Sequence, residues 1–275
     1  MILFDANKCV SCNSCIRACP TPEANKAVQT EDGRTVYNID PDKCIRCGAC
    51  VKDCSHGART YEDDTAGFWN DVKGGKQVVL LVAPSIKVAF DGCWRNVLEF
   101  LRSNGVKDIY DVSFGADICT WAHIRYLQKN PGKKLISQPC PAIVNYMLKY
   151  CKEALPNLSP VQSPILCAAI YLRKYLGVNE KLAALTPCIA KQDEFRMTGV
   201  VDYNVTFEHL GQLLEEKGFH LADQKGKRSA FEFSGPQGIM GAIYPRPGGL
   251  KACLELEAPS LNVISSEGTG HILSL

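Results

Sequence analysis

The fold of this chain is decided at its start by the stretch Cys9-Val10-Ser11-Cys12-Asn13-Ser14-Cys15-Ile16-Arg17-Ala18-Cys19-Pro20. The same cysteine spacing returns 35 residues later, from Cys44 to Cys54, so the first 54 residues contain an internal repeat. Three cysteines at two-residue intervals can wrap around three corners of one cubane cluster of iron and sulfide. The fourth cysteine lies one helical turn further on, points away and ligates the other cluster.

This rule predicts two [4Fe-4S] clusters with exchanged fourth ligands. One is held by Cys9, Cys12, Cys15 and Cys54, and the second by Cys44, Cys47, Cys50 and Cys19. Structural zinc needs only four ligands, so the third cysteine of each run would be surplus for zinc. Disulfides need an oxidising compartment, and the sequence shows no signal-peptide pattern. The spacing therefore favours iron–sulfur clusters.

The composition agrees with a globular redox protein of about two domains. The chain has 275 residues, 46% of them hydrophobic, and no apolar run approaches the ~20 residues of a membrane span. A formal net charge of +2 gives no electrostatic case for nucleic acid. Fifteen cysteines favour metal binding, and reduced thiols with oxygen-sensitive clusters favour the cytoplasm of an anaerobe. We therefore expect no membrane and no nucleic-acid partner.

Three segments follow from the pattern along the chain. Residues 1–60 are expected to form a ferredoxin-like α+β unit with a hairpin around Asp32-Gly33, a dipeptide that favours tight turns. Residues 61–76 are polar, contain Gly74-Gly75 and are expected to be a linker. Residues 77–275 alternate between strand-like and helix-like patterns, which predicts an α/β domain with a mostly parallel sheet. We expect strands at 78–82, 109–112, 134–137 and 181–185, and helices at 94–102, 117–128, 142–150, 165–175, 207–217 and 250–256.

Four unusual tripeptides fall just beyond the expected strand ends. They are Ala83-Pro84-Ser85, Phe114-Gly115-Ala116, Pro139-Cys140-Pro141 and Thr186-Pro187-Cys188. Ligands of open α/β sheets bind at the carboxyl ends of strands, so these segments are expected to converge on one site. Each cysteine alone would be read as a small buried hydrophobe. Two cysteines flanked by proline at the same edge instead indicate metal ligands, namely Cys140 and Cys188.

These residues resemble the [FeFe]-hydrogenase family over nearly the whole chain. The family motif Pro-Cys-x-x-Lys-x-x-Glu is matched in full from Pro187 to Glu194. Phe114-Gly115-Ala116-Asp117 and Ala83-Pro84-Ser85 match two further signatures, and Pro247-Gly248-Gly249-Leu250 is similar to the turn of a later segment.

The resemblance implies a cofactor called the H-cluster, a cubane joined by one cysteine to a two-iron centre with CO, CN⁻ and a dithiolate. Cys140 and Cys188 match two cubane ligands, and Lys191 matches the donor to a cyanide, with Glu194 in the same pocket. A cationic donor beside an anionic ligand makes a strong hydrogen bond. Without the motif, Lys191 would be read as a surface residue paired with Glu194 or Asp193. The other matched pocket residues are Ala83, Pro84, Ser85 and Pro164.

The departures from the family pattern concern proton transfer. Pro139 stands where active members have a relaying cysteine, Ala122 and His123 stand where they have acidic residues, and Ile165 stands where they often have a glutamine. A route without titratable groups moves protons poorly. The chain is therefore similar to the sensory branch of the family, for which low turnover is expected.

The last two cubane ligands of the family come from a later segment, and no cysteine follows Cys253. Cys167 is either a local substitute or a packing residue. We expect a fragment or a reduced relative that does not complete an H-cluster alone and is inactive by itself; an active form would be a ferredoxin-type hydrogenase.

Three functions remain open at this stage. The chain is expected to be a hydrogenase-like redox protein with H2 and protons as substrates, or a sensor of H2 or redox state that reports to a downstream signalling domain. The alternative is an iron–sulfur electron carrier or cluster-assembly relative without H2 chemistry. In each case an electron donor or acceptor protein is the expected partner.

Overall fold

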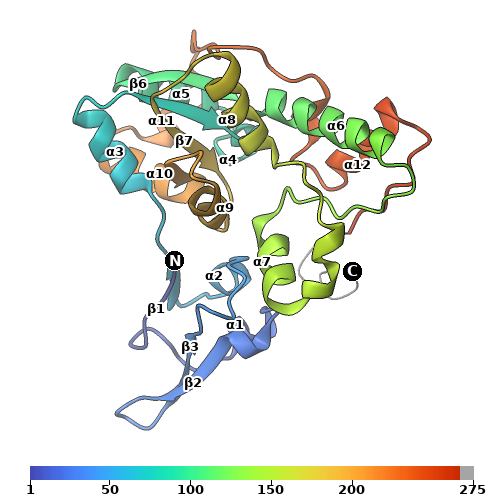
Figure 1. Cartoon of the computed structure of the whole chain (residues 1–275). Helices are drawn as coiled ribbons and strands as arrows, with labels where there is room; N and C mark the ends of the chain where they lie inside the picture. The colour runs from blue at the N-terminus through green and yellow to red at the C-terminus, as the bar shows by residue number, and fades with distance from the viewer. Residues whose placement is uncertain (267–275) are drawn as a thin grey trace.

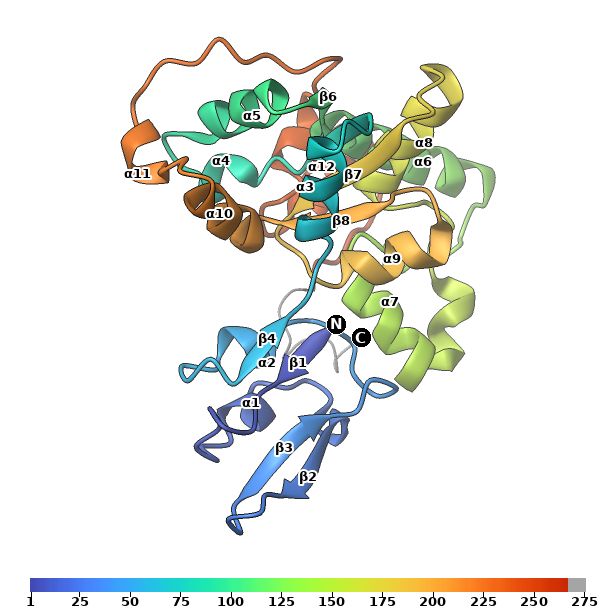
Figure 2. The same cartoon turned by 90° about the vertical axis from the view of Figure 1, so that its left-hand side faces the viewer.

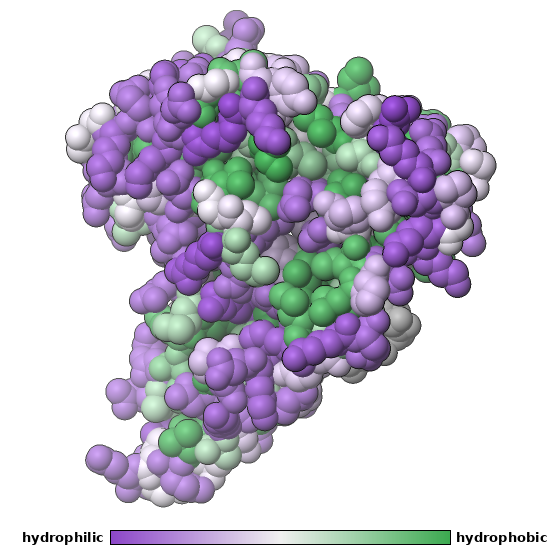
Figure 3. Space-filling model, in the orientation of Figure 1, coloured by the Kyte–Doolittle hydropathy of each residue, from purple (hydrophilic) through white to green (hydrophobic). Residues whose placement is uncertain are grey.

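The computed structural model describes residues 1–266 of the chain. A small N-terminal unit lies below a larger α/β domain (Figures 1 and 2). The two meet at α7 (Pro141–Tyr150), α9 (Lys191–Thr198) and the start of α3 (Thr65–Lys73). Apolar side chains gather over α7 beside this junction (Figure 3), where Leu148 is 38% exposed. No helix within residues 1–266 is long and apolar enough to cross a membrane.

The N-terminal unit consists of two antiparallel strand pairs and two one-turn helices. β1 (Ile2–Phe4) pairs with β4 (Arg59–Tyr61), and β2 (Asn25–Gln29) pairs with β3 (Thr35–Ile39). The hairpin predicted around Asp32-Gly33 is confirmed, and Gly33 has the positive φ of 81° that such a turn requires. The repeat is visible in α1 (Ser14–Arg17) and α2 (Ala49–Lys52), each of which contains the third cysteine of its run.

The sheet of the second part is parallel, as expected, with the strand order β6-β5-β7-β8. Its strands are β5 (Val78–Val82), β6 (Val106–Asp111), β7 (Lys181–Thr186) and β8 (Tyr203–Thr206). All five residues of β5 are buried because helices cover both faces of the sheet. One face packs on Leu98 and Leu210, and the other packs on Leu172.

Helices and short 3-10 turns make up the remaining elements of residues 1–266. They are α3 (Thr65–Lys73), α4 (Ile86–Ala89), α5 (Trp94–Ser103), α6 (Val112–Lys129), α7 (Pro141–Tyr150), α8 (Pro164–Tyr175), α9 (Lys191–Thr198), α10 (Phe207–Glu216), α11 (Leu221–Gln224) and α12 (Gly249–Glu257), with 3-10 turns at η1 (Pro22–Ala24), η2 (Lys152–Asn157) and η3 (Met240–Ile243).

Two sequence expectations are corrected by the structure. The expected linker at 61–76 contains α3, whose Phe68 and Val72 are buried in the sheet core. The burial of these apolar side chains stabilises a helix in a segment that is otherwise polar. The expected strand at 134–137 is only an isolated bridge between Ile136 and Leu158. Strand β8 was not anticipated, although all four of its residues are buried.

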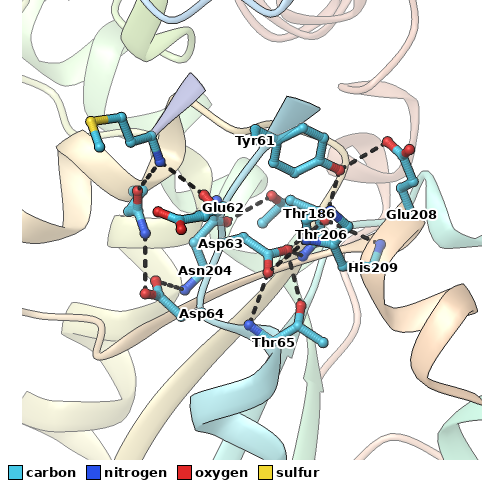
Figure 4. A network of polar contacts seen from close by, with 12 residues as sticks. Tyr61, Glu62, Asp63, Asp64, Thr65, Thr186, Asn204, Thr206, Glu208 and His209 are labelled. Atoms are coloured by element: carbon cyan, nitrogen blue, oxygen red, sulfur yellow. Dashed lines mark hydrogen bonds and ion pairs between the residues drawn. The ribbon is translucent and has the colours of Figure 1, made fainter. Parts of the chain in front are cut away.

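A polar network ties the exit of the N-terminal unit to the sheet (Figure 4). The Asp63 carboxylate accepts hydrogen bonds from the backbone N–H (2.8 Å) and hydroxyl (2.6 Å) of Thr206 and pairs with Nδ1 of His209 at 3.0 Å. The Tyr61 hydroxyl donates to Glu208 at 2.9 Å. Burial alone would raise the pKa of Asp63, but these donors outweigh burial and lower it to about 2.

Candidate metal centres

The first cysteine group lines a hollow in the N-terminal unit. The hollow has a volume of about 380 Å³, part of which is open to solvent. Its lining includes the four cysteines predicted for the first cluster, Cys9, Cys12, Cys15 and Cys54. The structure thus brings the fourth cysteine of the second run to the first run, and ligation by these residues remains a prediction.

Both cysteine loops have the same unusual backbone. Ser11 and Asn13 adopt positive φ angles of 58° and 62° in the first loop. Arg46 and Gly48, 35 residues later, adopt 59° and 80°. Left-handed conformations cost energy for residues other than glycine and cluster at functional sites. The repeated conformation therefore indicates that both loops are shaped to surround a bound group.

The second cysteine group consists of Cys44, Cys47, Cys50 and Cys19. Burial, followed by the proximity of the other thiols, raises the pKa of Cys47 to about 11 and that of Cys50 to about 12. Cysteines bind metals as thiolates, so these four thiols must lose their protons. At their raised pKa values, Cys47 and Cys50 would do so only when a bound cation stabilises the negative charge. Iron would provide this cation, which fits the predicted second cluster.

The donor sets suit a large group better than a single ion. Within residues 1–266, no three His, Cys, Asp or Glu side chains lie close enough together to hold one metal ion. Arg59 lies at the edge of the first hollow, is only 3% exposed and has a buried Nη1 atom without a hydrogen-bond partner. A buried unpaired cation fits an anionic cluster, and a thiolate-ligated cubane is anionic.

The third candidate site lies where α7 and α9 begin. Cys140 is the N-cap residue of α7, and Cys188 precedes α9. Cys140 does not follow a strand, contrary to expectation. Burial raises the pKa of the Cys188 thiol, and the charge of Cys140 acts in the same direction. The Cys188 carbonyl accepts a hydrogen bond from Asn204 Nδ2 at 3.0 Å, and its N–H donates to Thr186 Oγ1 at 3.1 Å.

Lys191 is held next to this pair. Its side chain is 8% exposed, and its Nζ donates to Glu194 Oε2 at 2.6 Å and to the Pro139 carbonyl at 3.2 Å. Lys191 therefore pairs with Glu194, but as a buried residue and not as a surface residue. Its ammonium bridges the two segments that carry Cys140 and Cys188.

The other matched segments position helices around the site. The N–H of Ala83 donates to the Leu185 carbonyl at 3.0 Å, which places Ala83-Pro84-Ser85 beside the end of β7. Gly115 lies where α6 crosses α8, because a Cβ there would be 2.2 Å from the carbonyl oxygen of Pro164. The Asp117 carboxylate accepts from the N–H groups of Ile239 (2.8 Å) and Gly241 (2.5 Å), so it fixes the segment before α12.

A buried cluster around Cys119 was missed by sequence reasoning. Its Sγ lies 3.2 Å from the Tyr244 hydroxyl, 3.3 Å from the Gln162 carbonyl and 3.7 Å from Nδ1 of His123. Cys167 Sγ lies 3.4 Å from the same Gln162 carbonyl. Hydrogen bonds from Cys167 and then His123 lower the pKa of Cys119. Cys167 is thus engaged with packing partners, and the only sequence signal was the i, i+4 spacing of Cys119 and His123 on one helix.

A family model described as "Iron only hydrogenase large subunit, C-terminal domain" matches residues 76–266. This chain belongs to the iron-only hydrogenase family. A second model, described as "4Fe-4S dicluster domain", matches residues 1–55. The two matches together identify a hydrogenase-like iron–sulfur protein with a 4Fe-4S domain. Comparison by sequence with curated proteins finds no match.

Solved iron-only hydrogenases share the fold. An [FeFe]-hydrogenase studied for oxygen inactivation through its H cluster 2Fe subcluster has a TM-score of 0.51 at 21% identity. A variant of [FeFe]-hydrogenase HydA1 from Chlamydomonas reinhardtii has a TM-score of 0.50 at 21% identity. Both comparisons cover 71% of this chain, which spans only 57% of each relative. At this identity the likeness concerns the fold alone.

Proposed function

We propose that this chain carries electrons through two [4Fe-4S] clusters to a third metal site at Cys140 and Cys188. There it oxidises H2 or reduces protons, or senses H2 or redox state at low turnover. Membership of the iron-only hydrogenase family and the matched Pro187–Glu194 motif support this proposal. An electron donor or acceptor protein, or a signalling domain, is the proposed partner.

The observation that carries the proposal is the docking of the second cysteine loop. From α7, Lys149 Nζ donates to the carbonyl oxygens of Pro41 and Cys44, each at 3.0 Å, and the Tyr150 hydroxyl donates to the Lys43 carbonyl at 2.6 Å. Cys140 immediately precedes this helix. The loop around one proposed cluster is therefore fixed to the helix that begins at the third site.

The same loop is held from α9. Arg46 pairs with Asp193 at 2.5 Å, and Asn145 Nδ2 donates both to Asp193 (2.9 Å) and to the Ile45 carbonyl (3.2 Å). A Cβ on Gly48 would lie 3.3 Å from Ile189, the residue after Cys188. This close approach supports electron transfer between the second cluster and the third site.

The residues of the chain have the following proposed roles. The eight cysteines of the N-terminal loops would ligate two clusters, which supply reversible one-electron transfer when bound. Cys140 and Cys188 would ligate the third group, and Thr186 with Asn204 fixes the Cys188 backbone. Lys191 pairs with Glu194 and would donate a hydrogen bond to an anionic ligand.

Low turnover, and thus the sensory alternative, is supported by the side chains around the site. Pro139 has no proton to transfer and contributes only its carbonyl to Lys191. Ala122 cannot titrate. His123 is buried, and its Nε2 lies 3.2 Å from the Ser159 hydroxyl and 3.3 Å from the Ser137 hydroxyl.

A second candidate is an electron carrier or cluster-assembly relative without H2 chemistry. It is favoured by the number of thiols proposed for the third site, which are two, Cys140 and Cys188, where a cubane takes four. Cys253 is buried, and its thiol donates to the Met240 carbonyl at 3.4 Å. Cys167 is engaged with Cys119 and Gln162.

The test is an iron and sulfide analysis of protein purified and reconstituted without oxygen. About twelve irons per chain would support a third cubane, and about eight would support the carrier. After maturation, the hydrogenase or sensor function predicts infrared bands of CO and CN⁻. High H2 turnover would contradict the sensory role, and Pro139→Cys should raise activity if only the relay is missing. Absence of the infrared bands from this chain and from any longer form would refute H2 chemistry.

A further inference from the structure

Arg59 is a buried cation between the two cysteine loops. The residue lies on β4 and is only 3% exposed. Its Nη2 donates to the Tyr37 carbonyl, to Asn25 Oδ1 at 3.2 Å and to Cys15 Sγ at 3.6 Å. The guanidinium carbon lies 4.8 Å from the centre of the Phe4 ring.

This arginine has no carboxylate among its partners. Its hydrogen-bond acceptors within residues 1–266 are two neutral oxygens and one thiol sulfur, and its buried Nη1 has no hydrogen-bond partner. Burying a charge without an opposite charge is costly, so such residues are retained next to an anion. The anion that the surrounding residues can build is a thiolate-ligated iron–sulfur cluster.

The internal repeat contains no second copy of this arginine. Arg59 lies five residues after Cys54, and the residue five positions after Cys19 is Ala24. The Arg59 guanidinium contacts Cys15 of the first group and lines the first hollow. It also acts at longer range on Cys50 of the second group, where it partly offsets the effect of burial on the pKa.

We infer that Arg59 raises the reduction potential of the cluster held by Cys15. This inference rests on the proposed function. In the step concerned, the cluster gains one electron from the donor protein and with it one negative charge. A nearby cation stabilises the more negative, reduced form, so it raises the potential. Hydrogen bonds to cluster sulfurs and local charge are established determinants of such potentials.

The test is a redox titration followed by electron paramagnetic resonance on the full chain with reconstituted clusters. Arg59→Met should lower the equilibrium constant for reducing one cluster at least tenfold, which is about 59 mV for one electron. The second cluster should shift less. Arg34→Met is the matched control, because Arg34 donates to the Cys9 carbonyl at 2.6 Å but its side chain is 42% exposed. Solvent screens its charge, so we expect less than a roughly threefold change.

Arg59→Lys separates the charge from the other contacts. Lysine keeps the charge and loses the forked hydrogen bonds, so its cluster should stay within about threefold of the wild-type reduction constant. If Arg59→Met takes up no iron, Arg59→Lys still tests whether the positive charge raises the reduction potential. Unchanged potentials in Arg59→Met, or a tenfold fall in a fully loaded Arg59→Lys, would overturn the inference while leaving the proposed function intact. A wild-type chain that takes up no iron would refute the proposed function, and this inference with it.

Discussion

Asp193→Asn should loosen the second cysteine loop from the α/β domain without unfolding either part. The substitution keeps the size of the side chain and an oxygen for Asn145, but it removes the ion pair with Arg46. That pair is short, at 2.5 Å, and its side chains are 22% and 18% exposed. Exposed pairs are worth about 0.2–1 kcal/mol, and breaking a fully buried pair costs about 3–5 kcal/mol. We therefore expect an intermediate loss of about 2 kcal/mol.

A loss of about 2 kcal/mol corresponds to a roughly thirtyfold rise in the population of the undocked loop. Native-state hydrogen exchange would report this as a similar acceleration in amides of residues 43–50, with little change in the β2–β3 hairpin. Asp32→Asn is the matched control, because its pair with Arg34 has side chains 55% and 42% exposed. Adding Arg46→Met to Asp193→Asn should cause little further change. If residues 43–50 exchange no faster in Asp193→Asn than in the control, Arg46 and Asp193 do not hold the loop.

Three further predictions concern the junction, the helix crossing and the exchanged ligands. Asp63→Asn should lower the melting temperature at pH 7 by about 4–8 °C, because a pKa of about 2 against the usual 3.8 corresponds to about 2 kcal/mol. The contribution of the Asp63 carboxylate to stability is full above about pH 4 and is lost as pH falls through about 2. The difference in melting temperature between wild type and variant should therefore shrink in acid, and a difference that does not change with pH would contradict this prediction. Gly115→Ala should cost about 1–3 kcal/mol in denaturant unfolding because of the 2.2 Å clash with Pro164, whereas Gly67→Ala in α3, with nothing within 4 Å, should stabilise by about 0.5–1 kcal/mol. Equal effects of the two glycine substitutions would count against the crossing argument. Cys19→Ala should remove about four irons and spare the first cluster, whereas Cys93→Ala, a buried residue of the sheet core, should keep full iron; loss of the first cluster alone would show that the fourth ligands are not exchanged.

Sequence patterns predicted most of the fold because local signals were strong. Two local patterns each predicted the element that is observed. The apolar run from Val78 to Val82 forms a strand, and Asp32-Gly33 lies in the turn of a hairpin. Helix α3 was missed because its polar residues and Gly74-Gly75 hid the buried Phe68 and Val72. Burial of α3 depends on partners far along the chain, which a local pattern does not contain.

The candidate sites divide in the same way. Cysteine spacing predicted two ligand groups, and Cys54 lines the hollow of the first run as that pattern requires, while ligation stays a prediction. The roles of Arg59 and Asp193 could not be read from the sequence, since each depends on contacts more than 20 residues away. The cluster around Cys119 likewise requires α6, α8 and Tyr244 to meet in space.

The central claim is that iron is held at two N-terminal sites and at a third site joined to them through the docked second loop. The most direct measurement is an anomalous difference map at the iron absorption edge, from crystals of the anaerobically reconstituted full chain. We predict strong peaks within each N-terminal cysteine group and a further peak between Cys140 and Cys188. A map with no iron between those two sulfurs would contradict the third site, and a map with no iron at either N-terminal group would contradict the central claim as a whole.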